Sequence, residues 1–236
     1  MRRLVNAKFP DAIGQWLYPP VCLICGLTSQ SGLDCCAACH ADLPRLENRC
    51  LRCALETTRM LELCGRCTKD MPSFDSAWAG FVYRGPIETL VTRFKFQSDL
   101  AAGRVLARLL AEQLVKAGAP RPDLMVPVPL HPRRRLTRGF NQAAVVCRDL
   151  QGYLQGLPWA SLARRKRATR NQSELPAERR RGNVRGAFEL TWLPPGTTHV
   201  SLVDDVMTTG STLNECARVL KRAGVRRVDV WVVARA

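Results

Sequence analysis

Two kinds of hydrophobic segment are missing from this 236-residue sequence. No window approaches the ~18 apolar residues that a membrane-spanning helix needs. The first twenty residues begin with basic side chains, but Lys8, Pro10 and Asp11 interrupt any apolar stretch, which argues against a secretory signal peptide. We therefore expect a cytoplasmic protein without a transmembrane segment. In that compartment, paired cysteines are more often metal ligands than disulfides.

Acidic residues are also scarce relative to basic ones. Twenty Asp and Glu stand against 36 Lys and Arg, so the formal charge is +16. Such a balance favours polyanionic partners: nucleic acid, nucleotides, phosphates or an anionic membrane surface. The excess peaks between Arg164 and Arg185, where nine basic residues accompany only Glu174 and Glu178. This stretch is typical of a mobile loop that closes over a polyanion or binds a nucleic-acid backbone, and a solvated charged face is the alternative.

Cysteine, by contrast, is abundant and concentrated. Nine of the eleven cysteines lie between Cys22 and Cys67, and eight of these nine form four CxxC pairs. The first two pairs recur 28 positions later as the last two, which indicates an internal duplication. Each unit supplies the four thiolates that a tetrahedral structural zinc needs. The ligands of the two predicted sites are Cys22, Cys25, Cys36 and Cys39, and Cys50, Cys53, Cys64 and Cys67.

The spacing leaves some of the metal chemistry open. A crossed arrangement of the pairs is one alternative, and an iron–sulfur cluster is another. Cys35 is a spare cysteine, although it could replace Cys36 as a ligand. Because four cysteines close each site, we expect the metal to supply folding energy and no catalysis. Two tetrathiolate sites would lower the formal charge from +16 to about +12.

The composition divides the chain into three parts. Residues 1–20 are expected to form a short helical segment that Pro10 interrupts. Residues 21–72 form the predicted double zinc-binding region, which has few large apolar residues and could hardly build a core without metal. Residues 73–236 carry alternating strand and helix patterns and form the larger predicted domain.

The larger domain predicts an α/β fold with a mostly parallel sheet and helices on both faces. Strand patterns occur at 77–83, 124–128, 200–203 and 228–233, with a predicted edge strand at 188–190. Helical patterns follow Pro86 and occupy 98–118, 139–155 and 211–223, with Ser98 or Asp99 as the cap of the second helix. In such folds the ligand sits beyond the carboxyl ends of the strands.

The stretch 200–212, VSLVDDVMTTGST, lies at such an end. It is typical of a buried strand, two carboxylates, a turn of small residues and the start of a helix. The N–H groups and dipole of a helix N-terminus favour a phosphate. Asp204 and Asp205 are suited instead to sugar hydroxyls or to a metal bound to them. Together these features predict a ribose 5-phosphate pocket, and a strand end with an ordinary helix cap is the alternative.

Several motifs, in this order, resemble a known family. After the cysteine pairs come FVYRGPIETLVTRFKF, VPVPLHPRRRLTRGFNQA, RNQSELPAERRRGNVRGAF and LVDDVMTTGSTL. The last looks like the phosphoribosyl pyrophosphate (PRPP) signature of type I phosphoribosyltransferases. The whole series resembles the ComF (competence protein F) family, whose members carry an N-terminal zinc-binding region and a phosphoribosyltransferase-like domain.

The resemblance implies roles for particular residues. Asp204 and Asp205 would meet the ribose hydroxyls of PRPP, and Mg²⁺ would bridge hydroxyl and pyrophosphate oxygens. The stretch from Arg164 to Gln172 would be the flexible loop of the fold. The further implied PRPP-binding residues are Met207, Thr208, Thr209, Gly210, Ser211 and Thr212, of which Thr208 to Thr212 would wrap the 5-phosphate. The implied pyrophosphate-loop candidates are Lys95, Leu130, His131 and Arg133.

The resemblance also implies a biological role. It favours a protein that binds PRPP with Mg²⁺ and handles incoming single-stranded DNA during natural transformation, with a helicase-like partner. An active phosphoribosyltransferase, a glycosyltransferase that uses PRPP and an unknown acceptor, is one alternative. A zinc-domain adaptor is another. The sequence contains no clear nucleobase-recognition motif and no identifiable acid or base for an acceptor, so turnover is left open.

Overall fold

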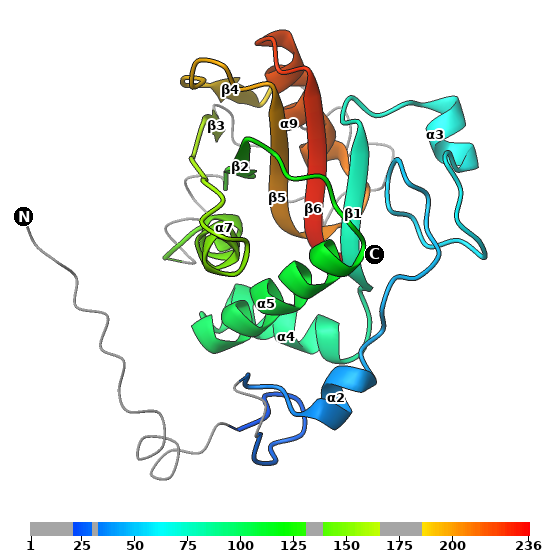
Figure 1. Cartoon of the computed structure of the whole chain (residues 1–236), viewed down its shortest axis with the longest axis vertical. Coiled ribbons are helices and arrows are strands. Elements are labelled where there is room, and N and C mark those ends of the chain that lie inside the picture. The colour runs from blue at the N-terminus through cyan, green and yellow to red at the C-terminus, as the bar shows by residue number, and fades with distance from the viewer. Residues whose placement is uncertain (1–20, 30–32, 131–138, 166–185) are drawn as a thin grey trace, which may run out of the picture. The chain divides into compact units, whose positions relative to one another are not determined.

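The structure is a computed structural model that describes residues 21–29, 33–130, 139–165 and 186–236 (Figure 1). The chain divides into two compact units, Met1–Leu43 and Pro44–Ala236. The predicted helical segment 1–20 lies outside the described residues, and the limits 21–72 and 73–236 remain a prediction.

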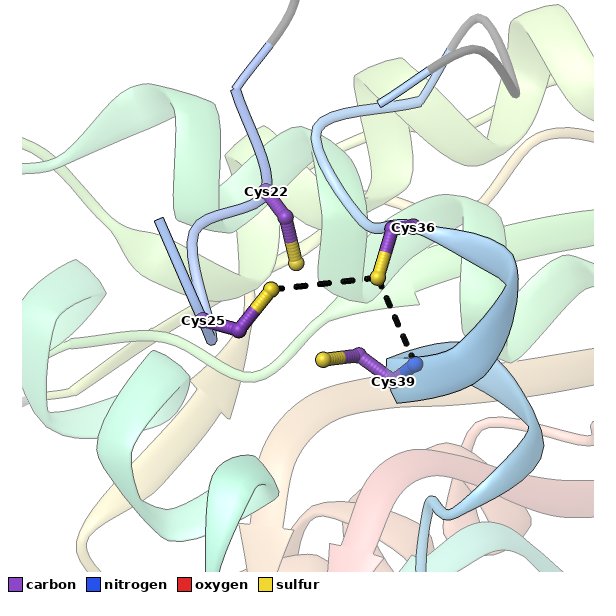
Figure 2. Close-up of side chains that lie close together, drawn as sticks. All are labelled: Cys22, Cys25, Cys36 and Cys39. Atoms are coloured by element: carbon purple, nitrogen blue, oxygen red, sulfur yellow. Dashed lines mark hydrogen bonds between the residues drawn. The ribbon is translucent and has the colours of Figure 1, made fainter. Parts of the chain in front are cut away.

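The first unit carries the first cysteine group on tight loops and one short helix. Helix α2 (Ala37–Ala41) begins after Cys36, whose sulfur accepts a hydrogen bond from the Cys39 N–H at 3.5 Å. The Leu23 N–H donates to the Asp34 carbonyl at 2.9 Å and links the two CxxC turns. Figure 2 shows that the four sulfurs point toward one another, into the space between the first CxxC turn and the start of α2.

A four-stranded sheet forms the centre of the second unit. Its strands are β1 (Ser76–Val82), β2 (Leu124–Pro127), β5 (His199–Met207) and β6 (Arg227–Arg235), in the order β1-β6-β5-β2. Every neighbouring pair is parallel. This confirms the predicted parallel α/β sheet, and most residues of its strands are buried because helices cover both faces.

Helices cover both faces of this sheet, as predicted. Helices α4 (Pro86–Phe96), α5 (Leu100–Lys116) and α7 (Gln142–Tyr153) lie on one face, and α9 (Ser211–Arg222) lies on the other (Figure 1). Asp99 is the N-cap of α5, since its side chain accepts from the Ala102 N–H. None of the described helices is long and apolar enough to cross a membrane.

Two short strands form a separate antiparallel ribbon. Strand β3 (Ala163–Arg165) pairs with β4 (Phe188–Leu190). The sequence predicted β4 as an edge strand, but its partner is β3 and not the main sheet. It did not predict β3, because three residues that include Arg164 and Arg165 carry no hydrophobic alternation.

The second cysteine group packs with the sheet of the second unit. Cys50, Cys53, Cys64 and Cys67 are all buried, and they share one apolar cluster with Phe74 and residues of β5, β6 and α9. Helix α3 (Gly65–Lys69) carries the last pair. The Arg52 guanidinium ties the first pair to the chain that leads into β1, donating to the carbonyls of Pro72 at 2.8 Å and Asp75 at 3.0 Å.

Candidate functional site

The carboxyl ends of β2 and β5 meet at one edge of the sheet. The two strands are parallel, with Leu124 opposite Val200 and Pro127 opposite Val203. The Val128 N–H continues the pairing by donating to the Val203 carbonyl at 2.9 Å. The loop after β2 therefore lies beside the end of β5, which is where the sequence placed the two halves of the ligand site.

A tight turn joins β5 to α9. Gly210 has a φ of 75°, a left-handed conformation that costs glycine little, and α9 begins at the next residue. The N-cap Gly210 has no side chain to cap this helix. The hydroxyls of Thr209 and Ser211 lie 2.8 Å apart, and the Ser211 N–H donates to Thr209 Oγ1 at 3.4 Å, which orders the turn. The remaining N–H groups of the first turn of α9, those after Ser211, are available to an anion, and the helix dipole favours one there.

The two carboxylates lie within β5, not after it. The strand extends to Met207, so Asp204 pairs with Val232 and Val206 with Ala234 of β6. Consecutive residues of a strand point to opposite faces. Asp205 is 6% exposed, and its Oδ1 accepts from the Val206 N–H at 2.6 Å.

Lys95 of α4 faces Asp205. The Lys95 Nζ lies 2.9 Å from Asp205 Oδ1. Burial tends to lower the pKa of Lys95, but the charge and hydrogen bond of Asp205, with a further contribution from Asp204, outweigh it and raise that pKa. Lys95 therefore stays a cation in the site.

These elements enclose a cavity of about 600 Å³, a size typical of small-molecule sites. Most of the predicted ligand-binding residues line it. They are Lys95, Leu130, Asp204, Asp205, Met207, Thr208, Gly210, Ser211 and Thr212. Thr209 lines a neighbouring cavity of about 420 Å³ instead. The predicted residues His131 and Arg133 lie outside the described residues, as does most of the loop from Arg164 to Gln172.

The sequence assigned no ligand role to four polar residues that line the same cavity: Tyr83, Ser98, Asn141 and Gln142. Asn141 caps α7 by accepting from the Ala143 N–H at 3.1 Å, and its amide donates to the Val128 carbonyl at 3.0 Å. It therefore fixes the loop after β2 against α7. The signal was available, because Asn before a helical pattern is a common N-cap.

The two cysteine groups fit a tetrahedral ion. In each group the four sulfurs lie within 4.8 Å of one another, in the sequential arrangement that the duplication predicted. Sulfurs around one zinc at about 2.3 Å lie roughly 3.8 Å apart. The distance is 3.8 Å between Cys25 and Cys36 and 3.7 Å between Cys53 and Cys64. No cysteine forms a disulfide, and Cys35 lies outside both groups, where burial raises its pKa to about 12.

Comparison with known proteins bears on both regions. Residues 13–71 match the family described as double zinc ribbon domain, a match that includes all eight paired cysteines. The DNA utilization protein YhgH of Salmonella typhi is 43% identical over 160 residues, which cover 65% of this chain and 69% of that protein. Competence protein F of Haemophilus influenzae is 39% identical over 162 residues, which cover 65% of this chain and 70% of that protein. This chain belongs to the ComF family.

A more distant ComF relative is competence protein ComFC of Streptococcus pneumoniae, 28% identical over 160 residues. Among solved structures, the fold is similar to a purine phosphoribosyltransferase from Pyrococcus horikoshii, with 17% identity and a TM-score of 0.35. That similarity covers 56% of this chain and 80% of the other. Because the score is low, the fold class rests on the parallel sheet and its flanking helices.

Proposed function

We propose that this ComF-family protein binds PRPP with Mg²⁺ in the cavity at the end of β5. The observation that carries the proposal is that Asp204, Asp205 and Lys95 line one cavity together with four residues of the turn, Thr208, Gly210, Ser211 and Thr212. The N-terminus of α9, which has glycine at its N-cap, suits the 5-phosphate. Carboxylates suit ribose hydroxyls, and a cation beside them suits a pyrophosphate.

Each group in the cavity would contact a different part of PRPP. The N–H groups at the start of α9 hold the phosphate, and Asp204 and Asp205 accept hydrogen bonds from the ribose hydroxyls. Mg²⁺ would supply charge neutralisation, bound chiefly through ligand oxygens as this ion usually is. Lys95 already contacts Asp205, so it is positioned to turn toward a pyrophosphate when the carboxylate engages the sugar.

Thermal unfolding tests this proposal directly. PRPP with Mg²⁺ should raise the free energy of unfolding by RT ln(1 + [L]/Kd), about 2.7 kcal/mol at a hundredfold excess over Kd. Ribose 5-phosphate is the matched control for the phosphate and ribose contacts alone, and it should stabilise less. No shift with PRPP and Mg²⁺ would reject the proposal.

We further propose that the protein acts on incoming single-stranded DNA. Its relatives carry the names DNA utilization protein and competence protein F, and the formal charge of +16 favours a polyanion. Phosphate contacts release counterions, so the affinity should fall steeply with salt. Fluorescence polarisation with a labelled oligonucleotide at several salt concentrations measures this slope, and a flat salt response would exclude phosphate contacts.

Phosphoribosyl transfer is a second candidate. The specific observation is that Tyr83, which has no part in the contacts assigned to PRPP, lines the same cavity and brings a phenol hydroxyl that can bond an acceptor. A screen for pyrophosphate release from PRPP with nucleobases and with single-stranded DNA tests it. Release that depends on one acceptor supports transfer, and binding without release with any of them rejects it.

A further inference from the structure

Two arginines connect the second cysteine group to the phosphate-binding turn. Arg66 lies between Cys64 and Cys67, and its Nη2 donates to the Thr209 carbonyl at 2.5 Å. Arg235 ends β6 and is only 4% exposed. Its Nε donates to the Cys53 carbonyl at 3.2 Å, and its Nη1 donates to the Met207 carbonyl at 3.0 Å. Both CxxC pairs of the group are thus linked to the turn.

These bonds help to set the direction of two backbone N–H groups, and the Ala236 N–H supports one of them by donating to the same Met207 carbonyl at 3.1 Å. A trans peptide is planar, so its carbonyl and its N–H point in opposite directions, and no described peptide bond is cis. The Thr209 carbonyl shares a peptide with the Gly210 N–H, and the Met207 carbonyl shares one with the Thr208 N–H. Holding these carbonyls toward the cysteine group therefore aims both N–H groups away from it.

The turn is the wall between two cavities. Met207, Gly210 and Ser211 line both the cavity that holds the carboxylates and the cavity of about 420 Å³ on the cysteine side. The N–H groups of Thr208 and Gly210 donate to no other backbone group in the described part of the chain. Oriented donors without a backbone acceptor are what an anion site needs.

The position of Arg66 depends on the cysteines. Helix α3 has five residues, too few to be stable by itself in water. Its start is held by the Cys64 N–H, which donates to the Cys50 sulfur at 3.2 Å, and by the packing of the four sulfurs around one point. An ion bound there would fix the helix and the direction of its arginine, because metal binding in such small motifs supplies the ordering energy.

We propose that the metal site formed by Cys50, Cys53, Cys64 and Cys67 positions the phosphate-binding turn, with Arg66 as the positioning residue. This inference rests on the proposed PRPP site and extends it. The second cysteine group is then part of the ligand-binding machinery as well as a source of stability.

Substitution of Arg66 tests the proposal. Arg66→Ala should weaken PRPP–Mg²⁺ binding about 5- to 10-fold, the range expected from one charged hydrogen bond at an exposed position. Arg66→Lys should recover part of the affinity, since lysine can donate one bond to the same carbonyl. Lys69→Ala, an exposed cation on the same helix, is the matched control and should bind as the wild type does. Unchanged affinity in Arg66→Ala would overturn the inference.

Two further measurements separate positioning from folding and from the proposed function. Zinc content and melting temperature should stay unchanged in Arg66→Ala, which excludes loss of the metal or of the fold. Amide NMR of the isotope-labelled protein without ligand should show shifted signals for Thr208 and Gly210 in Arg66→Ala and not in Lys69→Ala. If the wild type fails to bind PRPP, the proposed function is rejected, while unshifted amide signals independently reject the positioning role.

Discussion

The Lys95 Nζ lies 2.9 Å from Asp205 Oδ1 and joins helix α4 to the end of strand β5. Only 20% of the lysine side chain and 9% of the aspartate side chain are exposed. The cavity without ligand therefore contains a cation, Lys95, in contact with one of its two carboxylates, Asp205. Substituting only one of the two residues leaves a mostly buried charge without its partner. Such a substitution lowers the free energy of unfolding more than replacing both residues does.

The first prediction concerns this pair. Asp205→Asn should lower the free energy of unfolding by about 1–3 kcal/mol, because Lys95 loses its directly bonded carboxylate and keeps only its charge interaction with Asp204. Lys95→Met should cost a similar amount. The double variant should cost less than the sum of the two, which denaturant unfolding can measure as a coupling energy. Additive effects would show that the contact contributes nothing to stability.

A second prediction concerns the opposite end of the sheet. Asp229 is fully buried at the start of β6 and accepts hydrogen bonds from Ser76, His199 and Arg227 at 2.8–3.1 Å. Asp229→Ala leaves these donors unsatisfied and should cost about 2–4 kcal/mol of stability. Because the cluster lies at the amino ends of the strands, PRPP affinity of the folded variant should not change. Calorimetric titration well below its melting temperature checks this, and a weakened affinity would contradict the assignment.

Helix packing gives a third prediction. A Cβ on Gly103 of α5 would lie 2.6 Å from Phe94 Cε2, whereas a Cβ on Gly152 of α7 would meet no atom within 4 Å. Gly103→Ala should therefore destabilise the protein by about 1–3 kcal/mol through overpacking. Gly152→Ala should stabilise it by up to about 1 kcal/mol, since alanine favours a helix. Equal effects of the two substitutions in thermal unfolding would contradict this account of the α4–α5 contact.

The fourth prediction is a pH dependence at Asp99. Burial tends to raise the pKa of this carboxyl, but the Ala102 N–H and the Arg93 guanidinium outweigh burial and lower it. A carboxyl with a depressed folded-state pKa stabilises the protein above its unfolded pKa of about 4 and loses that contribution as the pH falls further. The wild type should thus have a higher free energy of unfolding than Asp99→Asn at pH 7, and this difference should vanish in acid.

Asp99→Ala provides the contrast for that measurement. Asn still caps a helix, so Asp99→Asn loses only the charge interaction with Arg93. Asp99→Ala also loses the cap and should cost about 1 kcal/mol more at every pH. A wild-type advantage over Asp99→Asn that does not vary between pH 7 and pH 3 would reject the ion pair as its cause.

The sequence predicted the part of the site that lies in one continuous segment of the chain. Asp204 to Thr212 form a continuous strand, turn and helix start, so their types and order sufficed. The CxxC duplication likewise predicted both four-cysteine groups, because each pair lies on one tight turn. The parallel sheet followed from the alternation of strands and helices.

Contacts between distant segments could not be predicted in the same way. The pairing of Lys95 with Asp205 depends on how α4 docks on the sheet, and the bonds of Arg66 and Arg235 depend on how the second cysteine group packs. Composition alone marked Lys95 as an ordinary solvated lysine. The β3–β4 ribbon was missed for a related reason, since strands of three residues carry no periodic signal of their own.

The central claim is that Asp204 and Asp205 with the turn after β5 bind PRPP. Isothermal titration calorimetry of PRPP with Mg²⁺ into the wild type and into Asp204→Asn/Asp205→Asn tests it most directly, with circular dichroism to show that the variant is folded. The account predicts binding by the wild type and no measurable binding by the folded double variant. Wild-type affinity in that variant would contradict it.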